Sequence, residues 1–160
     1  MPETLLKFVL FHILIVGGMV IGVPLLLLAD SGDFLPFDIG PFRYLGILPV
    51  LAGIAVYLAC NLHFHHHGKG SPAMYDPPKH FVAHGIYRYT RNPIYVSYFL
   101  FVFGEAILFE SAAILIYTAV LIFLIHLLVV IVEEPTLKER FGPEYEAYVR
   151  KVPRWLPRIK

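Results

Sequence analysis

The sequence predicts an all-α integral membrane protein with about four membrane-spanning helices and a C-terminal helix at the membrane surface. Of the 160 residues, 58% are hydrophobic and 16% are charged, whereas about a quarter of the residues in a soluble domain are charged. The apolar residues are also gathered in long blocks, as membrane spans require. The formal net charge of +1 gives no indication of nucleic-acid binding.

Four apolar blocks are the expected spans. The first covers residues 5–29 and the second covers residues 44–62, and each can cross a hydrocarbon core of about 30 Å. The first block is longer than the apolar core of a signal peptide and lacks the small residue expected before a cleavage site, so we expect it to be retained. The third, residues 94–109, follows Pro93, which suits the first turn of a helix. The fourth covers residues 112–132.

The segments outside the spans contain the helix-breaking residues. Several prolines in residues 63–92 forbid a continuous helix there. Pro135 is expected to start or kink a further helix, and Gly142-Pro143 to interrupt it. The remaining tail mixes aromatic and charged residues, as expected of a segment at the membrane surface. No internal repeat is visible, so we treat residues 1–160 as one domain.

Basic residues predict the orientation in the membrane. The loop after the first span is acidic, whereas residues 63–92 contain two lysines and two arginines, and the segment from residue 133 onward contains seven basic residues. Loops rich in Lys and Arg remain in the cytoplasm. We therefore expect both termini and the 63–92 loop to be cytoplasmic, which an even number of spans permits.

Ionisable residues inside or at the end of the predicted spans are candidates for function, because they are costly in a bilayer. They are His12, Glu105, His126 and the pair Glu133-Glu134. His126 and Glu133 are seven residues apart, about two helical turns, and so share one face of the fourth span. For Glu105 a structural role is favoured, and helix packing is the favoured reason for the neighbouring Gly104.

The pair Glu133-Glu134 has two interpretations. One is a solvated helix end, since charges commonly mark the place where a span leaves the lipid. The other is that the pair neutralises a positive charge, because acidic groups at a helix C-terminus lie at the negative end of the macrodipole. Arg88, Arg91 and a cationic ligand are candidates for that charge.

Two further features carry less information. Neighbouring histidines on one helix point in different directions, and no cysteine or paired carboxylate joins the run at 63–67, so no metal site is predicted. Contact with anionic lipid headgroups is the favoured role for this run, which consists of His63, His65, His66 and His67. The single cysteine, Cys60, excludes an internal disulfide and is expected to be a small buried residue.

Ordered motifs between residue 63 and the C-terminus resemble the isoprenylcysteine carboxyl methyltransferase family, which is related to the small membrane phospholipid methyltransferases. The motifs are His84-Gly85-x-Tyr87-Arg88-x-x-Arg91-Asn92-Pro93-x-Tyr95, Glu133-Glu134-x-x-Leu137, Phe141-Gly142-x-x-Tyr145-x-x-Tyr148, Val152-Pro153-Arg154 with Trp155 and Pro157, and Gly70-Ser71-Pro72. Asn92 stands where eukaryotic members typically have histidine and bacterial-type members often have asparagine. The similarity to bacterial-type members favours the inner membrane of a bacterium. The difference from eukaryotic members at Asn92 leaves the choice of substrate open.

The resemblance implies S-adenosylmethionine as the methyl donor, bound by the part of the chain from about residue 63 to residue 160. It implies catalytic roles for Arg91 and Glu133. The cofactor-binding residues it implies are His84, Gly85, Tyr87, Arg88, Asn92, Pro93, Tyr95, Glu134, Tyr145 and Tyr148. Which of Arg88 and Arg91 contacts the cofactor and which contacts the substrate stays open.

The acceptor implied is a lipophilic molecule that reaches the enzyme from the membrane lipids. The carboxylate of a prenylated cysteine, a phospholipid amine and a small lipophilic metabolite all fit. A different class of protein is a small b-type haem protein, with His12 and His126 as ligands. A reductase of related fold and a non-catalytic membrane scaffold are further alternatives. The sequence does not determine the oligomeric state.

Overall fold

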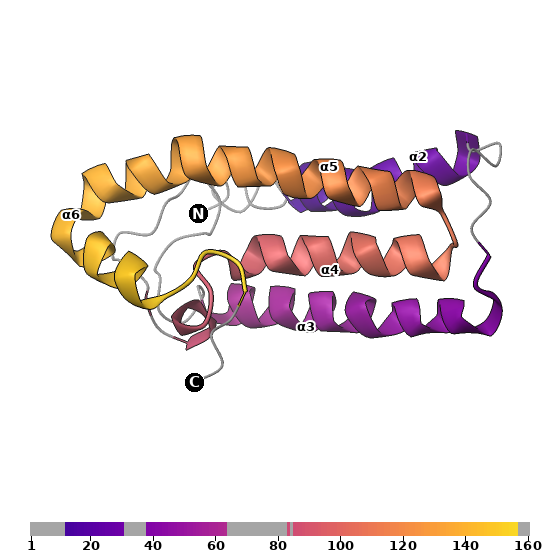
Figure 1. Ribbon diagram of the computed structural model, residues 1–160, viewed down its shortest axis with the longest axis horizontal. Coiled ribbons are helices and arrows are strands. Elements are labelled where there is room, and N and C mark those ends of the chain that lie inside the picture. Colours follow the sequence, from indigo (N-terminus) through magenta and orange to yellow (C-terminus); the bar gives the residue numbers. More distant parts are fainter. Residues whose placement is uncertain (1–11, 31–37, 64–82, 84, 157–160) are drawn as a thin grey trace, which may run out of the picture. The chain divides into compact units, whose positions relative to one another are not determined.

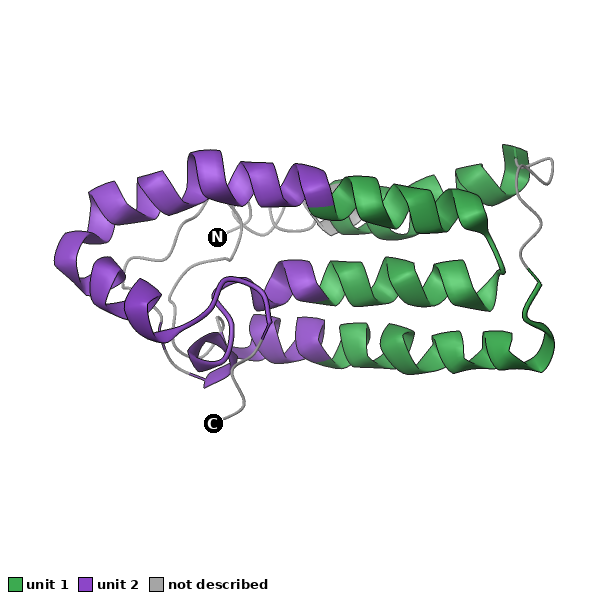
Figure 2. Ribbon diagram, in the orientation of Figure 1, with its two compact units in different colours: residues 1–55, 97–122 green, residues 56–96, 123–160 purple. Residues whose placement is uncertain are grey.

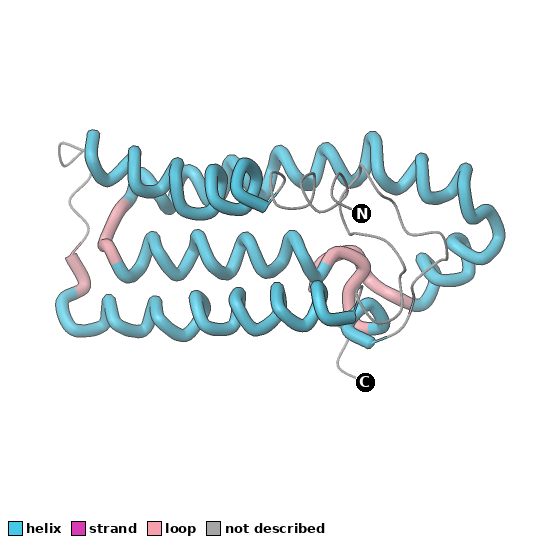
Figure 3. Tube along the Cα trace, turned by 180° about the vertical axis from the view of Figure 1, so that it is seen from behind, coloured by secondary structure: helices cyan, strands magenta, loops and turns pink. Residues whose placement is uncertain are grey.

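The computed structural model describes residues 12–30, 38–63, 83 and 85–156. These residues form helices and connecting loops, and the described part contains no strand (Figure 3). The prediction of an all-α protein is therefore confirmed.

The described residues form two π-helical and two 3₁₀ segments in addition to five α-helices, and Figure 1 shows their course. In chain order they are η1 (His12–Gly22), α2 (Val23–Asp30), η2 (Gly40–Gly46), α3 (Ile47–His63), η4 (Gly85–Arg88), α4 (Pro93–Leu108), α5 (Ala112–Leu128), η5 (Val129–Glu133) and α6 (Glu134–Lys151). The π-helical segments are η1 and η5.

Local chemistry explains several of the helix boundaries. Pro93 begins α4, as predicted, because its fixed φ and missing N–H suit the first turn. Ser111 caps α5, since its Oγ accepts the N–H of Ile114 at 3.2 Å. Pro135 lies in the first turn of α6, and Gly142 kinks this helix with φ 50° and ψ −125°. The start of a helix at Pro135 and the interruption at Gly142 were both predicted from the sequence.

Two stretches of helix among the described residues are long and apolar enough to cross a membrane, namely Gly40–His63 and Ala112–Lys151. They contain the second and fourth predicted spans. Val16–Asp30 and Pro93–Leu108 form shorter apolar helices. The assignment of four spans, with the first and third among them, stays a prediction.

The chain divides into two compact units, and Figure 2 colours them separately. Unit 1 contains residues 1–55 and 97–122, and unit 2 contains residues 56–96 and 123–160. The prediction of a single domain over the whole chain stays a prediction.

In unit 1, the end of η2 and α4 approach each other closely at two glycines. A Cβ added to Gly104 would lie 2.6 Å from the carbonyl oxygen of Gly46. Helix packing is therefore a sufficient reason for glycine at this position, as expected. The neighbouring Glu105 is 9% exposed, and its Oε2 makes no hydrogen bond within the described part of the chain.

A carboxylate secures the start of η2 in unit 1. Oε1 of Glu110 accepts the N–H groups of Ile39 at 2.9 Å and Gly40 at 3.0 Å. Oε2 of Glu110 also lies 3.5 Å from a guanidinium nitrogen of Arg43. The side chain of Glu110 thus satisfies amides that have no partner inside the helix.

We expect Glu110→Ala to lower the free energy of unfolding by about 1–3 kcal/mol, because it leaves the N–H of Ile39 without its acceptor, whereas the N–H of Gly40 keeps Oδ1 of Asp38 at 2.8 Å. Thermal unfolding in detergent measures the loss. Glu110→Gln keeps a side-chain acceptor and should lose less. Arg43→Ala removes a contact whose arginine is 44% exposed and should cost less than Glu110→Ala. A larger loss in Arg43→Ala than in Glu110→Ala would contradict this account.

In unit 2, the second half of α6 and the residues after it form a small core. Tyr145, Tyr148 and Val152 are buried together. Partly buried hydrophobic residues pack against them, namely Ala83, Leu137, Phe141 and Val149. This core positions residues 152–156, the last residues that the structure describes, which contribute to a polar site.

Candidate functional site

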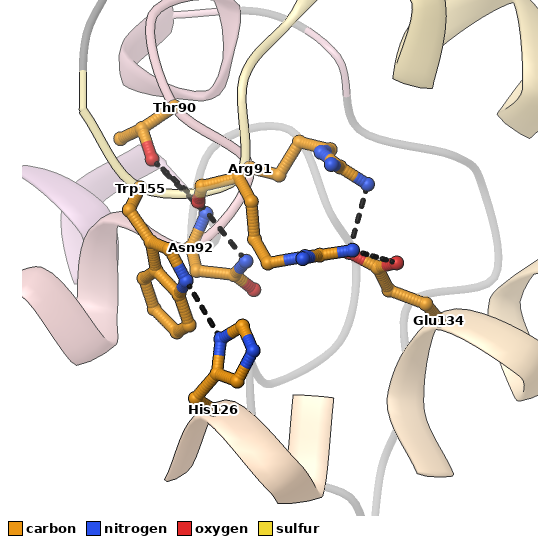
Figure 4. Close-up of polar contacts among 7 residues, drawn as sticks. Thr90, Arg91, Asn92, His126, Glu134 and Trp155 are labelled. Atoms are coloured by element: carbon orange, nitrogen blue, oxygen red, sulfur yellow. Dashed lines mark hydrogen bonds and ion pairs between the residues drawn. The ribbon is translucent and has the colours of Figure 1, made fainter. Parts of the chain in front are cut away.

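The polar site of unit 2 is centred on the carboxylate of Glu134, which two arginines bind (Figure 4). A guanidinium nitrogen of Arg91 lies 2.8 Å from Oε1 of Glu134. Arg154 forms a two-pronged contact, with Nε 2.7 Å from Oε1 and a terminal nitrogen 2.9 Å from Oε2. Such a fork fixes both the position and the plane of the carboxylate.

This network is sheltered rather than superficial. The exposed fractions of the side chains are 10% for Arg91, 19% for Glu134 and 30% for Arg154. The hydrogen bond to Glu134 is the main cause that raises the pKa of the Arg154 guanidinium above its ordinary value. Arg154 is therefore a permanent cation, and the carboxylate binds two positive charges. The predicted pairing of the acidic residues with Arg91 is thus observed for Glu134.

Backbone bonds join the loop before α4 to the chain end. The N–H of Arg91 donates to the carbonyl oxygen of Pro153 at 3.0 Å. The carbonyl oxygen of Arg154 accepts Thr90 Oγ1 at 3.0 Å and Asn92 Nδ2 at 3.2 Å. Figure 4 shows Thr90, Arg91 and Asn92 gathered in this network. Arg91 therefore enters the site from a loop that is fixed on both sides.

The structure distinguishes the two arginines of the motif. Arg91 is nine-tenths buried, and its Nε makes no hydrogen bond within the described part of the chain. Arg88 is exposed, and its guanidinium carbon lies 4.7 Å from the ring centroid of Tyr89. A buried guanidinium with an unused donor is a better candidate for binding an anion than one that lies on a surface tyrosine.

Glu133 and Glu134 have different partners although they are adjacent. Tyr95, in the first turns of α4, donates its hydroxyl hydrogen to Glu133. Glu133 is the last residue of the π-helical segment η5, and α6 begins at Glu134. π-helical turns change the phase of a helix and are frequent at functional sites. Tyr95 and Glu133 form a second polar contact of unit 2.

Three tyrosines of the motif, Tyr87, Tyr145 and Tyr148, are linked by contacts within unit 2. The hydroxyl of Tyr148 donates to the carbonyl oxygen of Tyr87 at 2.6 Å. The ring centroids of Tyr145 and Tyr148 are 6.3 Å apart, with their planes tilted by 44°. Tyr148 therefore connects the second half of α6 to η4.

Gly85 begins η4 with φ +61°, and a Cβ there would lie 2.6 Å from the ring of His63. The backbone and the neighbouring ring both require glycine. This requirement explains Gly85 whether or not a ligand contacts it.

We expect Gly85→Ala to lower the free energy of unfolding by about 1–2 kcal/mol from the positive φ, with an added loss from the contact with His63. Gly142→Ala is the matched control, because Gly142 has φ +50° and an added Cβ would meet nothing within 4 Å. Thermal unfolding of both variants measures the difference. A His63→Ala background should abolish the added loss. An equal loss from Gly85→Ala with and without His63→Ala would show that His63 does not constrain Gly85.

Some predicted residues cannot be placed. His84, His65, His66 and His67 lie outside the described residues, as does the side chain of His12. The described residues contain no group of three or more potential metal ligands. His63 lies on α3 beside Tyr87, with ring centroids 6.2 Å apart.

Sequence reasoning missed the role of the chain end. The sequence motif contains Arg154 and Trp155 but indicated no role for them, yet Arg154 contacts both carboxylate oxygens of Glu134. The indole N–H of Trp155 donates to Nδ1 of His126 at 3.1 Å. The acidic pair Glu133-Glu134 needed a cationic partner, and this need was the signal that could have indicated Arg154. Arg154 lies 20 residues from Glu134 in the sequence, beyond a helix kink, so the sequence did not show that the two residues meet.

Comparison with models of known families assigns the chain to a family. Residues 42–144, well over half of the chain, match the model of the phospholipid methyltransferase family. The chain belongs to the phospholipid methyltransferase family. The match contains Arg91, Tyr95, Glu133 and Glu134, but ends before Tyr145, Arg154 and Trp155.

One curated relative connects this methyltransferase family to the predicted resemblance. A segment of 78 residues is 32% identical to the protein-S-isoprenylcysteine O-methyltransferase of Schizosaccharomyces pombe (strain 972 / ATCC 24843). The segment covers 49% of this chain and 33% of the relative, so the match spans a third of the relative's length. The predicted resemblance to the isoprenylcysteine methyltransferases is confirmed, and no comparison supports the haem alternative.

Proposed function

We propose that this membrane methyltransferase uses S-adenosylmethionine and methylates a lipophilic acceptor at the cytoplasmic surface. The observation that carries the proposal is the sheltered cluster of Arg91, Glu134 and Arg154, in a chain of a methyltransferase family. Arg91 offers an unused buried donor at the centre of this cluster. Charges held in a sheltered site act more strongly than the same charges in water.

The described residues fit the proposed cofactor. When bound, S-adenosylmethionine supplies a methyl group activated by a sulfonium. Arg91 would meet its carboxylate with the unused Nε. Glu133 would meet its ammonium where the acceptor is a carboxylate, which needs no general base. The rings of Tyr87, Tyr95, Tyr145 and Tyr148 would provide aromatic contacts, since a cation is attracted to the face of an aromatic ring.

The other residues of the motif have proposed roles in positioning or in binding the cofactor. Glu134 already binds two arginines, so we assign it first to positioning Arg91 and second to the cofactor. Asn92 and Pro93 would place the loop and the start of α4. The roles proposed for Gly85, Arg88 and His84 rest on the family motif.

The catalytic roles proposed for Arg91 and Glu133 depend on the acceptor. A carboxylate acceptor needs no general base, and a guanidinium is enough to orient it. An amine acceptor must lose a proton, which Glu133, bonded to the Tyr95 hydroxyl, would accept. Two acceptors follow from the comparisons. The name of the yeast relative favours the carboxylate of a prenylated cysteine, and the family model supports a phospholipid amine.

Transfer of a labelled methyl group tests this proposal and separates the acceptors. Purified protein is incubated with methyl-labelled S-adenosylmethionine and either a prenylated cysteine or phospholipid vesicles. A methyl ester releases volatile label in base, whereas an N-methyl group keeps it. Base-labile label with the prenylated cysteine would support the first acceptor, and stable label in phospholipid would support the second. Label in neither acceptor, nor in a total lipid extract, would contradict the proposal.

A further inference from the structure

The chain end of unit 2, here called the C-terminal strap (residues 152–156), is anchored to α5 by an aromatic pair. The indole N–H of Trp155 donates to Nδ1 of His126 at 3.1 Å. The two ring centroids are 6.0 Å apart, with the planes tilted by 41°. Figure 4 shows the indole of Trp155 joined to the imidazole of His126 by this hydrogen bond. The proposed function assigns no role to either side chain.

The same strap contacts the site through the residues immediately before Trp155. The carbonyl oxygen of Pro153 accepts the N–H of Arg91, and the carbonyl oxygen of Arg154 accepts Thr90 and Asn92. The guanidinium of Arg154 binds Glu134, and Glu134 in turn binds Arg91. Arg91 is therefore connected to the strap twice, by its own backbone and by its side chain through Glu134.

We propose that His126 and Trp155 are positioning residues, which fix the strap on α5 and so hold Arg91 in the orientation that binds the cofactor. The inference rests on the proposed function, because it takes Arg91 to be the residue that binds the cofactor carboxylate. Arg154 holds the strap on α6 through Glu134, whereas Trp155 holds it on α5 through His126, so the two anchors act at different places. A large aromatic side chain adds packing area and a directed N–H bond.

The variants separate the hydrogen bond from the bulk of the side chains. His126→Leu fills the space without an acceptor, whereas His126→Gln retains a side-chain acceptor. Trp155→Phe retains an aromatic ring without the N–H. If the bond is the effective element, the double variant His126→Leu/Trp155→Phe should be no worse than either single variant, because coupled residues are not additive.

Two measurements on the full chain in detergent test the inference. The first is amide hydrogen exchange at residues 90–92 and 152–156 without any ligand. The second is the calorimetric Kd for S-adenosylhomocysteine, the demethylated cofactor. We expect exchange at the Arg91 amide to rise, and binding to weaken, by about 3- to 10-fold in His126→Leu and Trp155→Phe. His126→Gln should remain near the unchanged protein in both.

The outcomes distinguish this inference from the proposed function. Unchanged exchange and Kd in His126→Leu, or a His126→Gln variant as impaired as His126→Leu, would overturn the positioning role. Absence of S-adenosylhomocysteine binding by the unchanged, folded protein would overturn the proposed function instead. The exchange measurement needs no ligand and would still show whether His126 and Trp155 hold the strap.

Discussion

Replacement of Glu134 with alanine should produce the largest combined loss of stability and binding. The substitution removes the acceptor of three hydrogen bonds and leaves two guanidinium groups side by side without a counter-ion. Removal of one partner from a fully buried ion pair costs about 3–5 kcal/mol. Because the side chains of Glu134 and Arg154 are 19% and 30% exposed, we expect about 2–4 kcal/mol. Thermal unfolding in detergent measures this loss.

A matched control separates the loss of the arginine contacts from the loss of one negative charge on α6. Glu139 is an exposed glutamate of the same helix, α6, so Glu139→Ala should change stability by no more than about 0.5 kcal/mol. Glu134→Gln keeps the acceptor oxygen and should fall between the two. The expected order is Glu134→Ala, Glu134→Gln and Glu139→Ala, from most to least destabilised. Equal stability of the Glu134 and Glu139 variants would show that the arginine contacts do not stabilise unit 2.

Arg91→Lys should weaken binding of S-adenosylhomocysteine by about 10- to 100-fold while the protein remains folded. Lysine keeps the positive charge near Glu134 but has no Nε donor and no planar fork. A lost hydrogen bond between charged groups is worth about 1.5–3 kcal/mol, which gives the expected range. Calorimetric titration of the folded variant measures it.

Two comparisons make this result specific to the buried arginine. Arg140 lies on α6 with its guanidinium 5.3 Å from the Phe141 ring centroid, and Arg140→Lys should bind as the unchanged protein does. Arg88→Lys tests the second arginine of the motif, and the exposed position of Arg88 predicts a smaller loss than in Arg91→Lys. A larger loss in Arg88→Lys would assign the cofactor carboxylate to Arg88 and overturn the role given to Arg91.

The helical architecture follows closely from the sequence because single local signals determine it. Pro93 begins α4 and Gly142 kinks α6. Both residues act through their own backbone geometry, so the local sequence is enough to predict their effects. The π-helical segment η5 was not predicted, because a one-residue change of helical phase leaves no mark on an apolar run. It matters because it lies just before Glu134.

The site is only partly visible in the sequence. The motif order identified Arg91 and Glu134 as candidates, and their contact at 2.8 Å joins residues 43 positions apart. The sequence could not show that Arg154 occupies both oxygens of Glu134, nor that Trp155 binds His126. These contacts depend on how the chain returns after the kink at Gly142, which is a tertiary property.

The measurement that tests the central claim most directly is calorimetric titration of detergent-purified, folded protein with S-adenosylmethionine and with S-adenosylhomocysteine, beside the Arg91→Lys variant. We predict saturable binding of both compounds at micromolar concentrations, weakened at least tenfold in the variant. That result would place the cofactor at the cluster of Arg91, Glu134 and Arg154. An absence of saturable binding, with membrane lipid present and the protein folded, would contradict the account, and so would equal binding by the variant.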